Sequence, residues 1–220
     1  MEKRYIFGDV HGDYGKLTKL INKIANDFHP EKDKLIFLGD YVSHGNESFL
    51  VIDFLIKLAK QVKTEFLMGD HDKAFLEYSK DHRKSDYIEK MDGKTTADSY
   101  MRKLSTSQIP KDHIQFFDSL KLTYEEDDFF CVHAGMNPNK SNIREQKLED
   151  LLTIGESFYN SSRVWKKLVI FGHCNLGELK NEGNFPYFDK SRNLLGLDTG
   201  CGRGGRLSCF EVRTLKFYQA

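Results

Sequence analysis

The sequence predicts an α/β protein whose sheets are covered by helices, and two observations support this prediction. In the first half, short apolar runs typical of strands alternate with segments whose apolar residues recur at helical spacing. In the last third, short apolar runs follow one another with few helical patterns between them. This order is typical of a layered α/β architecture. The 220 residues suit one domain, 1–220, because neither a repeat nor a Pro/Gly-rich linker divides them.

The first half alternates strand and helix. Between residues 14 and 27, for example, apolar side chains recur at the spacing of a helix face. Strands are expected at 4–8, 34–38 and 64–68, and helices at 14–27, 46–61 and 72–81. The polar segment 85–111 is expected to contain short helices, followed by a helix at 112–119.

The second half is expected to consist mostly of strands. One helical segment, 144–160, interrupts them. The expected strands are 122–125, 129–133, 168–171, 194–197, 207–212 and 215–218.

Composition limits the partners. There are 33 basic and 33 acidic residues, so the net charge is zero and gives no strong nucleic-acid or membrane signal. Apolar runs such as 35–38 and 168–171 are too short to span a bilayer. The N-terminal residues enter a strand-like run without a signal region, so a cytoplasmic protein is expected. The cysteines form no Cys-x-x-Cys pair and are expected to be reduced and partly buried: Cys131, Cys174, Cys201 and Cys209.

Five of the expected strands are followed by a glycine together with a histidine or an aspartate. Because ligands of open α/β sheets bind outside the carboxyl ends of the strands, these side chains are expected to share one cleft. The residues are Asp9 and His11 after the first strand, Asp40 after the second, Asp70 and His71 after the third, His133 after 129–132, and His173 after 168–171.

Carboxylate oxygens and imidazole nitrogens suit divalent cations such as Mn, Fe and Zn. Two cations about 3.5–4 Å apart clamp a phosphoryl group and activate a bridging water for in-line attack. Taken singly, an aspartate after a strand is usually a helix cap, and a lone buried histidine is usually a core residue. Five strand ends together favour a metal site. Three other histidines, His29, His82 and His113, have polar neighbours in the sequence and are expected at the surface.

These blocks resemble the phosphoprotein phosphatase branch of the calcineurin-like metallophosphoesterases, which includes small bacterial and phage protein phosphatases and diadenosine tetraphosphatase. The pattern of that branch is G-D-x-H-G, G-D-x-x-D-R-G, G-N-H-E/D, H-A-G and G-H, and its blocks occur here in order between Ile6 and Leu207. The resemblance implies a four-layer fold with two packed mixed β-sheets and helices outside. It also implies a metal-dependent hydrolase.

Carried over residue by residue, the resemblance assigns two metal sites. Asp9 and His11 would bind the first cation, and Asp40 would bridge both. Asp70, His133 and His173 would bind the second. The cations would be two divalent ions, most readily Mn²⁺, with Fe or Zn as alternatives. His71 would be the catalytic residue, as a general acid or as a group that steadies the phosphate.

The second block departs from the family pattern, since Ser43 and His44 replace an aspartate that orients the catalytic histidine and an arginine that grips phosphate. Asp70 stands in place of an asparagine, and Gly155 in place of a second arginine. Losing the carboxylate removes a term that raises a histidine pKa and fixes its tautomer. Losing arginines removes bidentate phosphate contacts. Only a rebuilt loop would bring Arg163 into the role of the second arginine.

Two classes of function remain open. The first is an active hydrolase acting on a phosphorylated protein or a nucleotide, including a phosphodiester or diadenosine tetraphosphate. The second is a metal-binding pseudophosphatase that serves as a binding or regulatory module. For the hydrolase, His44 and Arg203 are expected to contact substrate. His44 stands in the place of the family's arginine and could supply one hydrogen-bond donor. Arg203 lies in a glycine-rich stretch, 198–207, that resembles an active-site border of the family.

Overall fold

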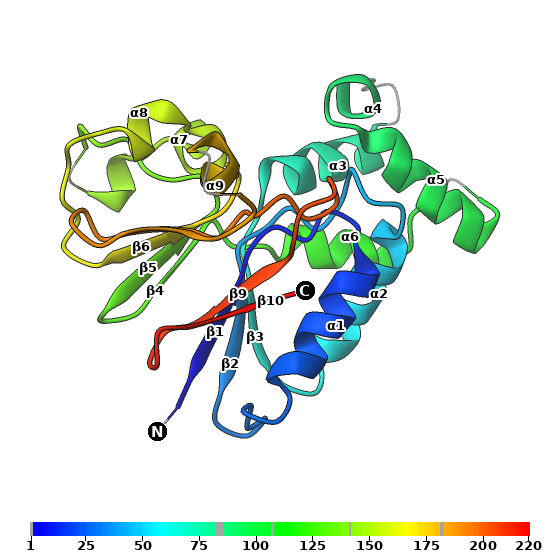
Figure 1. Ribbon diagram of the computed structural model, residues 1–220. Coiled ribbons are helices and arrows are strands. Elements are labelled where there is room, and N and C mark those ends of the chain that lie inside the picture. The colour runs from blue at the N-terminus through cyan, green and yellow to red at the C-terminus, as the bar shows by residue number, and fades with distance from the viewer. Residues whose placement is uncertain (1, 82–85, 107, 141, 181–182) are drawn as a thin grey trace.

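Two mixed five-stranded β-sheets form the centre of the protein (Figure 1). The computed structural model describes residues 2–81, 86–106, 108–140, 142–180 and 183–220. The sheets are flanked by helices, as the family resemblance implies. Within the described ranges no helix has the length and apolar character needed to cross a membrane.

The first sheet has the strand order β10-β9-β1-β2-β3. Its first three strands along the chain run parallel, with Tyr5 opposite Leu35 and Leu35 opposite Thr64. The last two strands along the chain are antiparallel to their neighbours. The strands are β1 (Arg4–Phe7), β2 (Lys34–Phe37), β3 (Lys63–Phe66), β9 (Ser208–Glu211) and β10 (Lys216–Gln219).

The second sheet has the strand order β4-β5-β6-β8-β7. Its three central strands are parallel, and both edge strands are antiparallel to their neighbours. The strands are β4 (Thr123–Glu125), β5 (Phe129–Val132), β6 (Leu168–Phe171), β7 (Tyr187–Asp189) and β8 (Leu194–Gly196).

Each central strand is apolar on both faces, because each sheet is covered on both sides. In β1, Tyr5 and Phe7 face the helices, whereas Ile6 joins the layer between the sheets. In β5, Cys131 joins that middle layer, whereas Val132 packs under the other helices. The alternation gives four layers: helices, sheet, sheet and helices.

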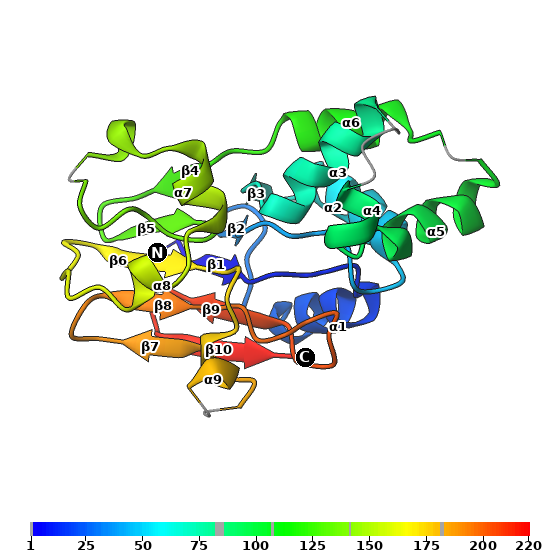
Figure 2. The ribbon, with the colours of Figure 1, turned by 90° about the horizontal axis from the view of Figure 1, so that it is seen from above.

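The helices divide between the two outer layers (Figure 1). Those of the first half lie on the side of the first sheet: α1 (Tyr14–Ile24), α2 (Ser48–Ala59), α3 (Asp70–Lys80), α4 (Asp86–Lys90), α5 (Gly93–Leu104) and α6 (Lys111–Asp118). Shorter elements accompany the second sheet: the 3-10 turn η1 (Ile143–Glu145), α7 (Leu148–Thr153), α8 (Glu156–Tyr159) and α9 (Leu176–Leu179). Seen from above, α4 and α5 extend beyond α3 and away from the sheets (Figure 2).

The predicted helix 144–160 is wrong as a continuous element. The chain forms η1, α7 and α8 in succession, because Ile154 is extended and Gly155 adopts a backbone conformation outside the helical region. The sequence reading also missed β7 and α9. The other expected strands agree with the structure to within two residues at each end.

Candidate active site

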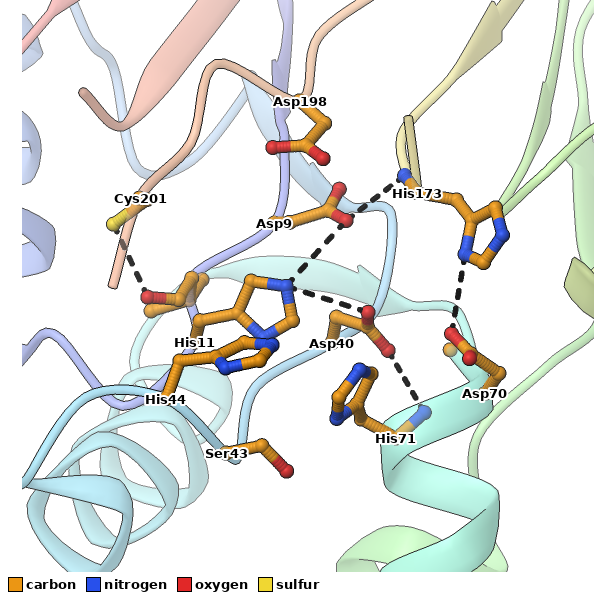
Figure 3. A network of polar contacts seen from close by, with 12 residues as sticks. Asp9, His11, Asp40, Ser43, His44, Asp70, His71, His173, Asp198 and Cys201 are labelled. Atoms are coloured by element: carbon orange, nitrogen blue, oxygen red, sulfur yellow. Dashed lines mark hydrogen bonds and ion pairs between the residues drawn. The ribbon is translucent and has the colours of Figure 1, made fainter. Parts of the chain in front are cut away.

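The predicted site residues meet at one edge of the two sheets (Figure 3). The loops after β1, β2 and β3 in the first sheet carry four of the predicted ligands, and the loops after β5 and β6 in the second sheet carry two. This convergence follows from the topology, because parallel strands present their carboxyl ends at the same edge. The six residues are Asp9, His11, Asp40, Asp70, His133 and His173.

These side chains form two groups of potential ligand atoms that share one residue. In the first group, Asp9, His11 and Asp40 each offer an atom within 4.8 Å of the others. In the second group, Asp40, Asp70, His133 and His173 do the same. The Oδ2 atom of Asp40 lies 3.5 Å from His11 Nε2 and 3.6 Å from His133 Nε2. Asp40 therefore stands between two adjacent donor sets.

The surroundings of these atoms fit a divalent cation. Asp9 Oδ1 is buried and has no hydrogen-bond partner among the described residues. A Cβ atom at Gly172 would come within 2.0 Å of that oxygen, and one at Gly69 would come equally close to Asp40 Oδ1. Glycine thus lets the backbone approach the carboxylates without filling the space around them.

Backbone carbonyls orient two of the imidazoles. His11 Nδ1 lies 3.0 Å from the carbonyl oxygen of Val42, and His133 Nδ1 lies 2.9 Å from that of Leu38. Donation from Nδ1 fixes the tautomer and leaves Nε2 directed at the carboxylates. This arrangement is usual for histidines that bind metal ions.

Several of the site residues hold a left-handed backbone. The φ angles are 44° at His11, 53° at Asp40 and 64° at His173. Residues with a side chain adopt this region at a cost, and such positions concentrate at functional sites. The loops therefore turn sharply enough to point these side chains into the cleft.

Burial and neighbouring charges raise the pKa of some groups in the cleft and lower the pKa of others. Burial raises the pKa of Asp9 and Asp40 well above the usual range, and repulsion from Asp198 and Asp70, respectively, raises each further. Burial also opposes ionisation of Asp70, but hydrogen bonds with His133 and His173 hold the pKa of Asp70 well below its usual value. The hydrogen bond to Asp70 likewise outweighs burial at His133 and raises the pKa of that ring to about 9. A cation would relieve the repulsion between the carboxylates.

His71 lies beside these groups without an orienting partner. Its Nδ1 atom is buried and has no hydrogen bond among the described residues. Ser43, which stands where the family has aspartate, turns its hydroxyl towards Tyr87 Oη at 3.2 Å. Burial lowers the pKa of His71 to about 4. The ring is therefore neutral near pH 7 in the protein without cations.

His44 faces the same cleft from the loop after β2. Its ring centroid lies 4.7 Å from that of His11 and 5.0 Å from that of His71. The Nδ1 atom is 3.2 Å from Asp92 Oδ2. Burial lowers the pKa of His44, so its ring also tends to be neutral.

Arg203 lies at the rim of the cleft. Its side chain is 47% exposed, and its guanidinium is 3.5 Å from Asp198 Oδ2. Together with His173 it lines a cavity of about 690 Å³. The other candidate arginine, Arg163, donates to the carbonyls of Pro138 and Lys140 and stacks on an indole ring, so its guanidinium is already engaged.

The sequence reading missed two buried carboxylates. Asp72 accepts hydrogen bonds from the backbone N–H groups of Asp40, Tyr41 and Gly69, so it joins the loops after β2 and β3. Its position in the first turn of α3 was a signal for capping, but nothing in the sequence indicated the loop after β2 as a partner. Asp198 lies beside Asp9 (Figure 3) and accepts from the Gly200 N–H.

The expectation that three histidines lie at the surface is only partly right. His29 is exposed. His113 is buried, because it lies on the inner face of α6 and its Nδ1 atom is 2.8 Å from Tyr100 Oη. His82 lies outside the described residues. The cysteines are free, as expected, with Cys131, Cys201 and Cys209 buried and Cys174 partly buried.

Comparisons with known proteins all indicate the same family. A family model described as calcineurin-like phosphoesterase matches residues 3–200. The asymmetrical bis(5'-nucleosyl)-tetraphosphatase PrpE of Anoxybacillus flavithermus is 25% identical, and the alignment covers 94% of this chain and 89% of that protein. The serine/threonine-protein phosphatase 4 catalytic subunit of Candida glabrata is 30% identical over 66% of this chain and 42% of that protein.

Solved structures share the fold. The crystal structure of a protein proposed to be a diadenosine tetraphosphatase superposes with a TM-score of 0.74 at 21% identity, covering 99% of this chain and 92% of that chain. A protein serine/threonine phosphatase from Saccharomyces cerevisiae superposes with a TM-score of 0.62 at 18% identity, covering 99% and 78%.

Proposed function

Because the chain belongs to the calcineurin-like phosphoesterase family, and is thus a metal-dependent hydrolase, we propose that it hydrolyses a phosphate ester at two divalent cations, most readily Mn²⁺. Asp9, His11 and Asp40 would hold the first cation. Asp40, Asp70, His133 and His173 would hold the second. When bound, such a pair of ions supplies charge for a phosphoryl group and lowers the pKa of water.

The observation that carries this proposal is the shared position of Asp40. Its Oδ2 atom is 3.5 Å from His11 Nε2 and 3.6 Å from His133 Nε2, so one carboxylate reaches both donor groups. A carboxylate serving a single structural ion would not need a second histidine on its other side. Shared carboxylates are typical of sites that keep two metal ions about 4 Å apart.

The residues around the ions would bind substrate and move protons. His71 would donate a hydrogen bond that steadies the phosphate, or a proton to the leaving-group oxygen once the charge of a bound phosphate raises its pKa from about 4. Its Nδ1 atom has no hydrogen-bond partner among the described residues. Arg203 and His44 would contact the substrate. The half-exposed guanidinium of Arg203 makes a 3.5 Å contact to Asp198 Oδ2 through Nη2, and its other N–H groups would donate to phosphate oxygens. The altered second block would therefore change how phosphate is held and leave the metal ligands in place.

The test combines metal analysis with turnover. Protein freed of metal and reloaded with Mn²⁺ should bind close to two ions per chain and hydrolyse an aryl phosphate monoester or diester. Asp40→Asn should lower the occupancy of both sites and abolish turnover, because it weakens the shared ligand. Two ions bound without turnover of either ester would favour the pseudophosphatase alternative. Unchanged stoichiometry in Asp40→Asn would overturn the assignment of a shared ligand.

A nucleotide is the second candidate substrate beside a phosphorylated protein. It is favoured by the near full-length similarity to a protein named for asymmetrical bis(5'-nucleosyl)-tetraphosphatase activity. The cavity beside His173 and Arg203 also offers the amide side chains of Asn175 and Asn184. Parallel assays with diadenosine tetraphosphate and a phosphoserine peptide distinguish the two substrate classes by kcat/KM.

A further inference from the structure

Three imidazoles form a third group of potential ligand atoms, which the proposed two-ion scheme does not use. His11, His44 and His71 each offer a ring nitrogen within 4.8 Å of the others. We call these residues the imidazole triad. The triad shares His11 with the carboxylates of the first proposed site. His44 and His71 thus lie next to the imidazole that the first proposed site uses.

His44, like His11 and His133, has an oxygen atom facing its Nδ1 atom. For His44 that oxygen is Asp92 Oδ2 at 3.2 Å, on a half-exposed side chain, whereas His11 and His133 face buried backbone carbonyls. Donation from Nδ1 to an oxygen fixes the tautomer that leaves Nε2 free for a ligand. His71 differs, because its buried Nδ1 atom has no partner among the described residues.

The backbone gives a second, independent observation. His44 has a φ angle of 62° and Asp92 has one of 50°, so both halves of this pair lie in the left-handed region. The proposed ligands His11, Asp40 and His173 share this conformation. Strain of this kind persists where the surrounding structure holds a side chain in a required direction.

We propose that His44 is a ligand of the cation at the Asp9–His11–Asp40 site, and that it gives this site a second imidazole. The inference rests on the proposed function, since it presumes an ion at His11. Nitrogens bound tetrahedrally at about 2.0–2.1 Å lie roughly 3.4 Å apart. The ring nitrogens of His11 and His44, which lie within 4.8 Å of each other, must therefore approach by up to about 1.4 Å to share one ion. His71, whose Nδ1 atom has no hydrogen-bond partner among the described residues, is not proposed as a ligand.

This ligand set favours a different cation from the one that carboxylates alone would hold. Imidazole suits Zn²⁺ and its neighbours, whereas carboxylate, carbonyl and water oxygens suit Mn²⁺. His44 should therefore raise the preference of the first site for Zn²⁺ over Mn²⁺. In this role His44 acts on a bound phosphate through the ion, which refines the direct substrate contact proposed above.

The first test is calorimetric titration of metal-free protein with Zn²⁺ and with Mn²⁺. The variant is His44→Asn, because asparagine tolerates the left-handed backbone. Affinity for Zn²⁺ should fall at least tenfold at one site, while affinity for Mn²⁺ changes less than threefold. Asp92→Asn should show a smaller loss in the same direction. His71→Gln is the matched control from the triad, and its Zn²⁺ affinity should equal that of the parent.

The second test observes the ring nitrogens directly by NMR of protein labelled with ¹⁵N-histidine. Saturation with Zn²⁺ should shift ring-nitrogen signals of four histidines, namely His11, His44, His133 and His173. The signal missing from His44→Asn must be one of the four. If that signal does not shift, or if both proteins bind Zn²⁺ equally, the inference is overturned while the proposed function stands. If the parent binds neither cation, the proposed function itself fails.

Discussion

At the scale of single residues, the cleft pairs groups whose protonation states depend on one another. Asp70 is held ionised by His133 and His173, and His133 is held protonated by Asp70, with its pKa raised to about 9. In the metal-free protein the positive charge of the protonated His133 ring thus lies where the charge of a metal ion would lie. A metal ion must displace that proton, because only the neutral ring can be a ligand.

The affinity for the second cation should therefore increase with pH. Below about pH 9 the metal-free protein carries the His133 proton, and binding must release it. The apparent dissociation constant should fall by up to about tenfold per pH unit from pH 6 upwards and then level off near pH 9. Calorimetry at pH 7 in two buffers of different ionisation enthalpy would count the protons. Release of none would contradict the proposed coordination by His133.

Arg203→Ala should lower kcat/KM by roughly tenfold or more, because a charged hydrogen bond contributes about 1.5–3 kcal/mol. The matched control is Arg206→Ala. The guanidinium of Arg206 lies over the Phe185 ring and contacts Gln219, so its loss should change catalysis little. The measurement is steady-state kinetics on the preferred substrate. A kcat/KM of Arg203→Ala within twofold of the parent value would show that Arg203 does not bind the substrate.

At the scale of elements, the geometry of the cleft depends on how the loops after β2 and β3 are joined. Asp72 on α3 accepts three backbone hydrogen bonds from those loops while fully buried. Burial raises the pKa of Asp72 to about 6, so the carboxylate is mostly ionised at neutral pH. One side chain therefore positions both Asp40, the proposed shared ligand, and the start of the helix that carries Asp70.

Asp72→Ala should destabilise the metal-free protein by about 3 kcal/mol or more, because three buried N–H groups lose their acceptor. It should also weaken cation binding, since Asp40 and Asp70 lose their relative placement. Urea unfolding and Mn²⁺ titration measure the two effects. Asp98→Ala is the control: among the described residues Asp98 forms an exposed ion pair with Lys94 on α5, and its loss should change stability by less than about 0.5 kcal/mol. Equal stability of the two variants would contradict the role of Asp72.

The sequence predicts those elements whose apolar residues recur with a clear period, above all the strands that a glycine follows. The parallel strands were predictable because each coincides with a short apolar run. The convergence of the histidines proposed as ligands was predictable because each of them follows such a run. The segment 144–160 was misjudged because helical spacing continues across Gly155, where the backbone departs from the helix. His113 was misjudged because its polar neighbours in the sequence face away while its own ring packs beneath α5, near Tyr100. The pairing of Asp92 with His44 spans 48 residues, and no local pattern indicates a contact of that range.

At the scale of the whole molecule, the cleft joins the two sheets. Asp9, His11 and Asp40 follow strands of the first sheet, whereas His133 and His173 follow strands of the second. A contact already crosses this boundary, because the backbone N–H of His173 donates to Asp9 Oδ2 at 2.8 Å. Cations bound here would fasten the sheets together and neutralise their carboxylates.

Removal of metal should therefore lower the melting temperature of the entire protein. An ion present at 100 times its dissociation constant stabilises the folded state by about 2.7 kcal/mol. For a chain of this size that corresponds to roughly 5–10 °C. Calorimetric melting with Mn²⁺ and with a chelator gives the difference, which His173→Gln should reduce. A chelator that leaves the melting temperature unchanged would show that the cleft does not couple the sheets through an ion.

The left-handed backbone at His11, Asp40 and His173 has a consequence for protein engineering. Each such residue carries a backbone strain of about 1 kcal/mol or more. Alanine at one of these positions removes the side chain and keeps the strain, whereas glycine removes both. Glycine, not alanine, is therefore the substitution that empties one corner of the cleft with the smaller cost to the loop that holds it.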